Sequence, residues 1–520
     1  MWGRLGDLLR LMKAGRTLAR YDALLLPEQI ALLPWPARFG LKMAKFGTRS
    51  PDADAQSRLT MALSSLGPSY IKLGQFLATR PDVVGPKRAF ELKALQDRLP
   101  PFPQDEARAI VSANLGGPVE QFFSEFGPPV AAASIAQVHR ARTGDGRDVA
   151  VKVLRPGVEK RFAADLSSFY LAARVIERTG AEGRRLRPVD AVAMLEQSMK
   201  LELDLRMEAS AISEMRGNTK DDQHFRLPLV DWPRTARQVL TTEWIDGTPI
   251  SEITALKAQG FDLDALADTV IQSFLRHAIR DGFFHADMHQ GNLFVDRAGN
   301  LVAVDFGITG RLNAKERLFL AEILYGFITR DYLRVSQVHF DAGYVPAHQD
   351  VATFAQAIRA IGEPIMDRPA GEISMARLLT QLFEVTAQFD MTTQPQLLLL
   401  QKTMVVVEGV ARTLNPDLNM WKTAEPVVKG WIERQLGPVG RVENMVETLG
   451  RMAATLPALL DETRAGADVL SRLADGGGIR LDPETTKALA KAQARETRWT
   501  RYALAAGALA LVVIAWRLLA

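Results

Sequence analysis

The stretch HADMHQGNLFVDRAGNLVAVDFG, residues 285–307, decides how the chain is interpreted. It contains two short apolar runs, NLFVD and LVAV, and each is typical of a β-strand. Asp287 and Asn292 are five positions apart before the first run, and Asp305 follows the second run, thirteen positions after Asn292. Oxygen ligands of this kind suit Mg²⁺ that bridges nucleotide phosphates. The spacing predicts a catalytic loop in which Asp287 faces the phosphoryl acceptor while Asn292 and Asp305 bind metal.

A lysine suited to nucleotide phosphates lies upstream, at the end of VAVK. The β-rich runs 134–142 and 148–154 are joined by TGDG, which predicts a hairpin. Alternation along the second run places Lys152 on one face of its strand. We interpret Lys152 as the residue that clamps the phosphates, with a strand-end lysine that reaches to solvent as the alternative.

An acid must hold this lysine, and a helical pattern over residues 189–216 supplies candidates. On one continuous helix Asp204 and Glu208 share a face, whereas Glu202 points away from Asp204. Glu208 is therefore the predicted partner of Lys152. The alternative, which a helix considered alone would favour, is that Glu202, Asp204 and Glu208 are three solvent-exposed acids.

The order of elements is typical of an α+β, bilobal protein-kinase-like fold. A strand hairpin is followed by helices, by two strand-like runs at 225–232 and 237–247, and by a helical part that contains the catalytic loop. The predicted organisation is a helical N-terminal extension (1–125), an N-lobe with inserted helices (126–247), a helical C-lobe (248–440), an amphipathic helical linker (441–498) and a C-terminal transmembrane helix (499–520).

Both ends of the chain suggest a membrane. Residues 502–520 are apolar except for Arg517, and nineteen residues of helix rise about 28 Å, close to one hydrocarbon thickness. The basic residues before this run place the body of the protein in the cytoplasm, at the inner (cytoplasmic) membrane. The first fifty residues are also basic, which fits either an anionic membrane surface or a solvated helix face.

Composition restricts the class of protein further. The chain has 520 residues, no cysteine and a formal net charge of +4. The lack of cysteine excludes a disulfide scaffold and thiolate metal sites. The small net charge gives no reason to expect nucleic acid as a partner.

These motifs resemble the UbiB family of atypical kinase-like proteins, which is linked to ubiquinone biosynthesis. YIKLGQFLATRPD resembles the family's Lys-x-Gly-Gln signature, PPVAAASIAQVHRA its alanine-rich nucleotide loop, and ELD its Glu-x-Asp element. The resemblance implies ATP and Mg²⁺ as cofactors. It implies that the ATP site comprises Val130, Ala131, Ala132, Ala133, Ser134, Ile135, Ala136, Gln137, Lys152 and Glu208. It also implies a regulatory lid comprising Lys72, Gly74, Gln75, Glu202 and Asp204.

The lid is expected to fold over the active site where a peptide substrate would otherwise bind. IKLGQ combines a cation, a flexible glycine and an amide, which makes a poor core strand but a workable cover for an acidic pocket. Asp204 and Glu202 are both candidate partners for Lys72.

The sequence departs from ordinary protein kinases at several positions. Alanines replace the glycines of the nucleotide loop, and their methyl groups predict a stiffer loop. Ala286 stands where protein kinases have an arginine that reads a phosphorylated activation loop, and no Ala-Pro-Glu triplet follows Asp305. These departures do not favour phosphorylation of other proteins. His285 is expected to brace the loop, whereas His289 is as typical of a surface histidine as of a functional one.

The predicted function is a membrane-anchored, ATP- and Mg²⁺-dependent atypical kinase or ATPase that supports ubiquinone biosynthesis. Expected partners are membrane lipids, ubiquinone precursors and enzymes of ubiquinone biosynthesis. Two alternatives are a small-molecule kinase of the phosphotransferase type, which needs neither lid nor membrane span, and a non-enzymatic scaffold of a biosynthetic complex.

Overall fold

The computed structural model describes residues 2–21, 23, 55–78, 84, 88, 91–92, 95, 99–178, 187–366, 381, 384–385, 388–391 and 395–436. The chain divides into two compact units, Met1–Glu433 and Arg434–Ala520. The predicted linker 441–498 and transmembrane helix 499–520 lie outside the described residues. Within the described residues, no helix has the length and apolar character needed to cross a membrane.

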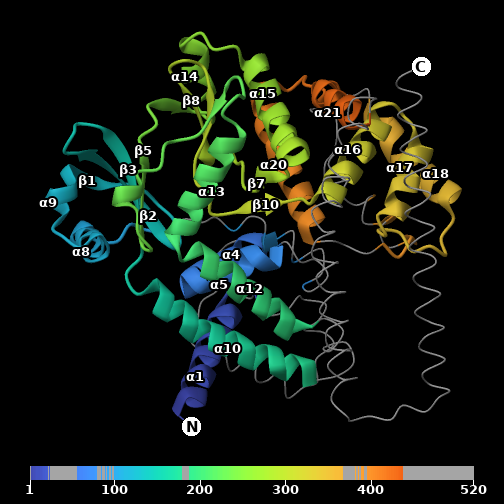
Figure 1. The fold of residues 1–520 in the computed structure, drawn as a ribbon. Helices are drawn as coiled ribbons and strands as arrows, with labels where there is room; N and C mark the ends of the chain where they lie inside the picture. The colour runs from blue at the N-terminus through green and yellow to red at the C-terminus, as the bar shows by residue number, and fades with distance from the viewer. Residues whose placement is uncertain are drawn as a thin grey trace, which may run out of the picture. The chain divides into compact units, whose positions relative to one another are not determined.

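A four-stranded antiparallel sheet forms the N-lobe (Figure 1). Its order is β1-β2-β3-β5, with bounds β1 (Phe123–Ala132), β2 (Ala136–Thr143), β3 (Asp148–Leu154) and β5 (Val239–Glu243). The predicted hairpin is present as β2 and β3. β1 was not predicted, because FGPPVAAA has the composition of a loop. The strand accommodates its prolines since it lies at the sheet edge and its register shifts between Phe126 and Pro129.

The two faces of the sheet have different partners, as Figure 1 shows. Val149, Val151 and Val153 of β3 are buried in a cluster with α8 (Gln104–Leu115) and α9 (Val119–Phe122). Alternate residues of β3 point the opposite way, toward the side where α13 (Leu205–Asn218) packs on β5. Lys152 is therefore directed toward α13.

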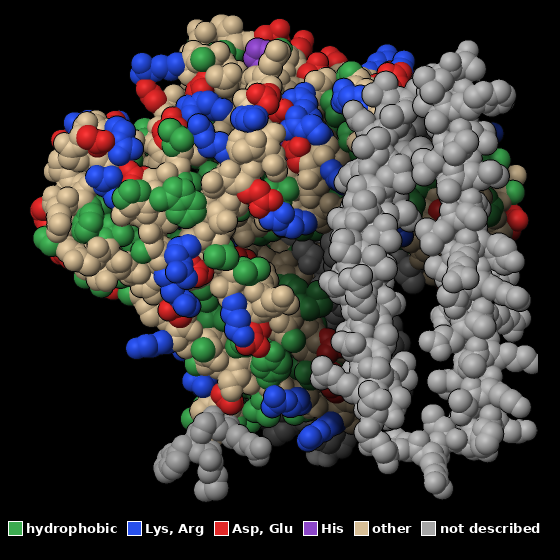
Figure 2. Space-filling view, in the orientation of Figure 1, with side chains coloured by type: hydrophobic (Ala, Val, Ile, Leu, Met, Phe, Trp, Pro, Cys, Tyr) green, Lys and Arg blue, Asp and Glu red, His purple; other side chains and the backbone are tan. Residues whose placement is uncertain are grey.

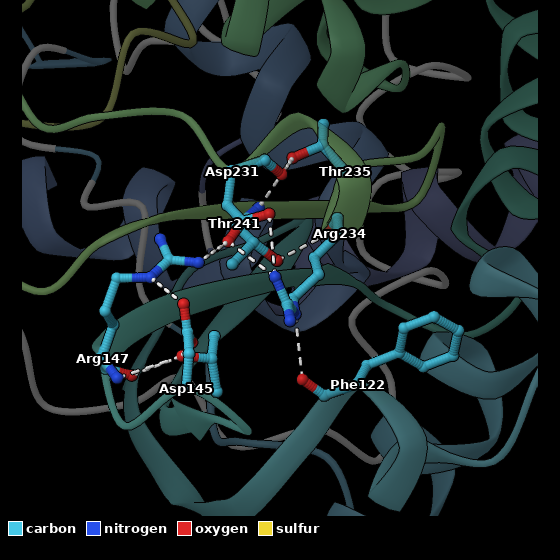
Figure 3. A network of polar contacts seen from close by, with 8 residues as sticks. Phe122, Asp145, Arg147, Asp231, Arg234, Thr235 and Thr241 are labelled. Carbon is cyan, nitrogen blue, oxygen red and sulfur yellow. Dashed lines mark hydrogen bonds and ion pairs between the residues drawn. The ribbon is translucent and has the colours of Figure 1, made fainter.

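A polar network fixes the turn that precedes β5 (Figure 3). Asp231 is nearly buried and lies 3.1 Å from Arg147 of the β2–β3 turn and 3.0 Å from Arg234. Arg234 also donates to the Phe122 carbonyl oxygen at 2.9 Å, and Thr241 donates to the carbonyl oxygen of Arg234 at 2.7 Å. The network joins the start of β1 and the β2–β3 turn, which lie at the same end of the sheet, to the segment before β5. β5 pairs with β3, the strand that carries Lys152.

The helical insert follows β3, and it corrects one prediction. The helix expected over 158–179 is α10 (Val158–Arg178). The single helix expected over 189–216 is instead two helices, α12 (Pro188–Glu202) and α13. Asp204 ends the first helical run because its carboxylate accepts the Arg206 backbone N–H at 3.1 Å and caps α13. Asp204 and Glu208 therefore do not lie on one continuous helix.

Three helices of the N-terminal extension pack beside α10. They are α1 (Trp2–Arg20), α4 (Ala55–Leu66) and α5 (Pro68–Ala78). α1 and α5 both contact α10, and the rings of Tyr70 and Phe169 meet edge to face at 5.0 Å. The described residues of this extension are mainly helical, and β1 begins at Phe123, before the predicted boundary at 125.

The C-lobe is mainly helical with short strands around the catalytic loop. Its strands are β6 (Gly247–Pro249), β7 (Phe283–His285), β8 (Leu293–Asp296), β9 (Leu301–Ala303) and β10 (Thr309–Arg311), and the earlier strand β4 (Phe225–Arg226) pairs with β9. β4-β9-β8-β6 form one small sheet and β10-β7 another. The helices are α14 (Ile253–Ala258), α15 (Leu263–Arg276), α16 (Ala314–Ile328), α17 (Tyr332–Asp341), α18 (Val351–Met366), α20 (Pro395–Leu414) and α21 (Met420–Leu436), and α15 packs closely against α20.

Candidate active site

Lys152 bridges two carboxylates. Its Nζ lies 2.9 Å from both Glu208 oxygens and 2.8 Å from Asp305 Oδ1. Burial lowers the pKa of Lys152, but the negative charges of Asp305 and Glu208 outweigh this effect and hold the pKa above its usual value. The predicted pair of Lys152 and Glu208 is thus formed, and the same ammonium links the N-lobe strand to the DFG loop of the C-lobe.

Asp305 follows β9 in an unusual backbone conformation. Its φ is +61°, in the left-handed region that aspartate tolerates better than most side chains. Desolvation raises the pKa of Asp305, whereas the ammonium groups of Lys152 and Lys72 lower it, and the pKa is held well below its usual range. The side chain is 45% exposed, so this ionised carboxylate is open to a further ligand.

The catalytic loop is held by its own histidine. His285 Nδ1 accepts the Asp287 backbone N–H at 3.0 Å, so Nε2 is the nitrogen that donates to the Val304 carbonyl oxygen at 3.1 Å. Burial lowers the pKa of His285, which keeps the ring neutral in this tautomer. Asn292 is also buried and donates to the Asp287 carbonyl oxygen at 3.1 Å. Asp287 and Asn292 are thereby fixed on the same loop, next to the strand that leads to Asp305.

His289 lies at the outer side of this loop. Its side chain is 51% exposed, and its Nε2 is 3.7 Å from Asp287 Oδ2. Its Nδ1 accepts the Gly291 backbone N–H at 3.0 Å. This histidine shapes the turn before Asn292 while remaining close to the predicted acceptor-side carboxylate.

The extension delivers Lys72 to the site. Lys72 Nζ is 2.7 Å from Glu202 Oε2, and each side chain is only 9% exposed. Of the two candidate partners, Glu202 is therefore the one that pairs with Lys72. Asp204 instead pairs with Arg206 at 2.6 Å. The charge of Lys72 also acts to lower the pKa of Asp305.

Gly74 does not supply the flexibility expected of a lid. It lies within the helix α5, and a Cβ at this position would come within 2.6 Å of Leu95 Cδ2 and 2.8 Å of Leu63 Cδ1. The absence of a side chain thus allows close packing of α5 against its neighbours. Gln75, the next residue, is half-buried on the same helix. The segment is a packed helix, so the interpretation of a flexible cover was wrong in its local structure.

The alanine-rich loop is the turn between β1 and β2. Val130 to Ala132 end β1, Ala133 to Ile135 form the turn, and Ala136 and Gln137 begin β2. Arg155 braces the turn, because its Nη2 donates to the Ala133 carbonyl oxygen at 2.8 Å and to that of Pro100 at 2.9 Å. These contacts restrain the loop in addition to the alanine methyl groups.

Residues along the loop differ in exposure. Val130 is 54% exposed, whereas Ser134, Ile135, Ala136 and Gln137 are buried. The Gln137 amide accepts the Phe102 N–H at 2.9 Å and donates to the Phe102 carbonyl oxygen at 3.2 Å. Its side chain therefore holds the segment before α8, a structural use that the predicted nucleotide role did not include.

Helix α20 contributes residues that sequence reasoning missed. Lys402 Nζ lies 3.8 Å from Asp287 Oδ1, and Thr403 Oγ1 lies 3.0 Å from the Ala286 carbonyl oxygen. Gln290 of the loop donates to Thr413 near the other end of the helix at 2.9 Å. The sequence contained a signal for this contact, because the polar triplet QKT interrupts the long apolar run LLLL…MVVV. Polar side chains within such a run need hydrogen-bonding or charged partners when they are buried.

The donor set fits a nucleotide-bound Mg²⁺ better than a metal held by the protein alone. Among the described residues, no group of three or more His, Cys, Asp or Glu side chains could hold a metal ion. Mg²⁺ commonly uses one or two protein ligands and completes its shell with phosphates and water. Asp305 and Asn292 match that pattern, since Asn292 keeps its carbonyl oxygen for other ligands while its amide nitrogen donates to the loop.

Comparison with known proteins identifies the family that this chain resembles in sequence. The ABC1 atypical kinase-like domain matches residues 94–339, and the UbiB helical domain matches residues 358–419. The "Probable protein kinase UbiB" of Marinobacter nauticus is 40% identical over 90% of this chain and 87% of its own length. The protein of the same description from Pseudomonas putida F1 is 41% identical over 87% of this chain and 86% of its own length. A solved complex of Rv3197 with erythromycin from Mycobacterium tuberculosis overlaps with a TM-score of 0.48 and 24% identity, covering 76% of this chain and 98% of that one.

Proposed function

We propose that this chain, which belongs to the UbiB family of ABC1 atypical kinase-like proteins, uses ATP and Mg²⁺ to support ubiquinone biosynthesis at a membrane. The activity is an ATPase or a kinase acting on a small or lipid-linked molecule. The observation that carries the proposal is the three-way contact of Lys152 with Glu208 and Asp305, at 2.8 to 2.9 Å. An ammonium fixed in this way, beside an ionised carboxylate open to a metal, is what transfer of a phosphoryl group requires.

Each residue of the site then has a chemical task. Lys152 would contact the phosphates of a bound nucleotide, with Glu208 holding it, and Asp305 and Asn292 would hold a Mg²⁺ whose charge would neutralise the phosphates. Asp287 orients the acceptor hydroxyl or water and receives its proton. The bond between the γ-phosphorus and its bridging oxygen breaks, and ADP leaves with that oxygen as the acceptor oxygen bonds to phosphorus.

The acceptor is not expected to be another protein. Lys72 and Glu202 form a buried ion pair between α5 and α12, and the charge of Lys72 reaches Asp305. We propose that α5, anchored by this ion pair, occupies space that an extended peptide substrate would need. Ala286, in place of the arginine that reads a phosphorylated activation loop, supports the same conclusion.

Membrane lipids are the proposed surroundings, and α1 supports this part. One stripe of the helix, at i, i+3, i+4 and i+7, is exposed and apolar and comprises Leu5, Leu8, Leu9 and Met12. Exposed Lys13 and Arg16 lie beside it. On the face drawn in Figure 2, hydrophobic side chains lie next to Lys and Arg side chains over α10, which packs against α1. Apolar stripes flanked by cations suit the surface of an anionic bilayer.

Product analysis with γ-labelled ATP tests the proposal. The purified full chain would be incubated with Mg²⁺, with and without ubiquinone precursors, and label would be measured in inorganic phosphate, in extracted lipid and in the chain itself. We expect Asp287→Asn to lower label transfer by about 10² to 10⁴. Asp246→Asn, which changes an exposed ion pair with Arg297, should leave it unchanged.

The outcomes separate the alternatives. Label in a soluble small molecule would favour a phosphotransferase of the small-molecule type. No transfer to any acceptor, water included, would refute the enzymatic proposal and favour a scaffold that organises a biosynthetic complex.

A further inference from the structure

Helix α20 lies against the catalytic loop although more than a hundred residues separate them in the sequence. The Thr403 hydroxyl is fully buried between the carbonyl oxygens of Ala286, at 3.0 Å, and Leu399, at 2.8 Å. Ala286 immediately precedes Asp287, so the position of α20 also fixes the start of the loop. Lys402, the neighbour of Thr403, lies with its ammonium 3.8 Å from Asp287 Oδ1.

Lys402 is held differently from the other two lysines of the site. Lys152 and Lys72 lie 2.7 to 2.9 Å from their carboxylate partners, within hydrogen-bonding distance. Lys402 and Asp287 are farther apart than a hydrogen bond allows, and their side chains are 36% and 29% exposed. The charge of Lys402 therefore acts on Asp287 through space, and the carboxylate oxygen remains accessible to an acceptor.

The other groups near Asp287 do not supply this fixed charge. His289 Nε2 is 3.7 Å from Oδ2, but a histidine is charged only when protonated. His285 is buried and neutral, and it accepts the Asp287 backbone N–H. Among the described residues, Lys402 is the lysine or arginine whose side-chain nitrogen lies within 4 Å of an Asp287 oxygen.

We infer that Lys402, supplied by the helical domain, is a positioning residue for Asp287 in phosphoryl transfer. Its ammonium, 3.8 Å from Oδ1, holds the carboxylate aimed at the acceptor side of the loop. A kinase-like domain and a separate helical domain thus build one site between them. This inference rests on the proposed function, because it assigns Lys402 a part in the same reaction.

Steady-state kinetics on the full chain test the inference. Phosphate release from γ-labelled ATP and the affinity for a fluorescent ATP analogue would be measured for Lys402→Met, Lys402→Arg, Asp287→Asn and the double variant Lys402→Met/Asp287→Asn. We expect Lys402→Met to lower kcat about tenfold, the size of a partly screened charge contact, while KM for ATP and nucleotide affinity stay within twofold. Lys402→Arg should restore most of kcat. Lys422→Met, which changes an exposed lysine of α21, is the control and should match the unmutated protein.

The double variant distinguishes action through Asp287 from a direct role. If Lys402 acts through that carboxylate, Lys402→Met causes no further loss once Asp287 is asparagine. Unchanged kcat in Lys402→Met, a loss confined to KM, or a further loss in the double variant would each overturn the inference. If the unmutated chain transfers label neither to water nor to any lipid or small-molecule acceptor, the proposed function falls with it. If the unmutated chain is active and Asp287→Asn lowers its activity but Lys402→Met does not, this inference is refuted and the proposed function stands.

Discussion

Removal of Lys72 offers a sharp test of how the extension is coupled to the site. Lys72 and Glu202 are 2.7 Å apart with side chains only 9% exposed, so Lys72→Ala leaves a carboxylate buried without its counter-charge. Breaking such a pair from one side costs about 3 to 5 kcal/mol, whereas removing both charges together is often close to neutral. We therefore expect each single variant, Lys72→Ala and Glu202→Ala, to lower the free energy of unfolding by about 3 kcal/mol. The double variant leaves no unpaired charge, but it truncates both buried side chains to alanine and so loses their packing. Its loss should therefore be about that of one single variant and well below the sum of the two.

Urea unfolding, followed by tryptophan fluorescence, measures the coupling. The interaction energy from the double-mutant cycle should be about 2 to 3 kcal/mol. The pair of Arg297 and Asp246 is a matched control, since it has a similar separation of 2.6 Å but side chains 85% and 69% exposed. Its cycle should give less than about 1 kcal/mol. A Lys72–Glu202 coupling no larger than that of the control would refute the argument from burial.

The same variants report on the site. Lys72 lowers the pKa of Asp305, and its removal frees the space and the charge beside that carboxylate. We expect Lys72→Ala to alter phosphoryl transfer, with label from γ-labelled ATP appearing on the chain itself. Lys72→Ala/Asp287→Asn should lose that label. If both variants match the unmutated protein, α5 does not control access to the site.

Three further outcomes are expected. Asp305→Asn should abolish the Mg²⁺ dependence of nucleotide binding, and isothermal titration with and without Mg²⁺ would contradict the metal role if that dependence persists. Ala132→Gly should change nucleotide affinity by about two- to fivefold, because the loop becomes more flexible, and identical binding curves would show that the loop does not touch the nucleotide. Deleting residues 502–520 should move the chain toward the soluble fraction, and a truncated chain that stays wholly membrane-bound after a high-salt wash would exclude 502–520 as the principal anchor. Leu8→Ser/Leu9→Ser should weaken sedimentation of the chain with anionic vesicles.

The sequence predicted the centre of the site because its spacings are local consequences of strands and turns. The hairpin places Lys152 on a defined face, and the loop 285–307 returns through two short strands that carry Asn292 and Asp305 to the same place. Glu208 could be chosen as the partner because a helix after the lysine strand has to supply an acid. These inferences need only periodicity and one chemical requirement.

What the sequence did not predict depends on tertiary contacts. The break at Asp204 was missed since a helical pattern continues through ELDLR, and the cap forms only when the carboxylate turns back to Arg206. β1 was missed because its prolines and alanines are tolerated only at a sheet edge. Gly74 was taken for a flexible residue, whereas the position requires glycine because Leu63 and Leu95 leave no room for a side chain.

The three lysines explain how the acidic site can exist at all. Its carboxylates would repel one another if left uncompensated. Lys152 pairs with both Glu208 and Asp305, Lys72 pairs with Glu202, and Lys402 lies near Asp287. Lys152 comes from the N-lobe sheet, whereas Lys72 and Lys402 come from the helices α5 and α20, outside residues 94–339 that match the kinase-like domain. The charge balance of the site therefore cannot be assigned to that domain alone. The extension and the helical domain each contribute a cation to the candidate site, and this is the physical reason that changes in either should be felt at Asp287 and Asp305.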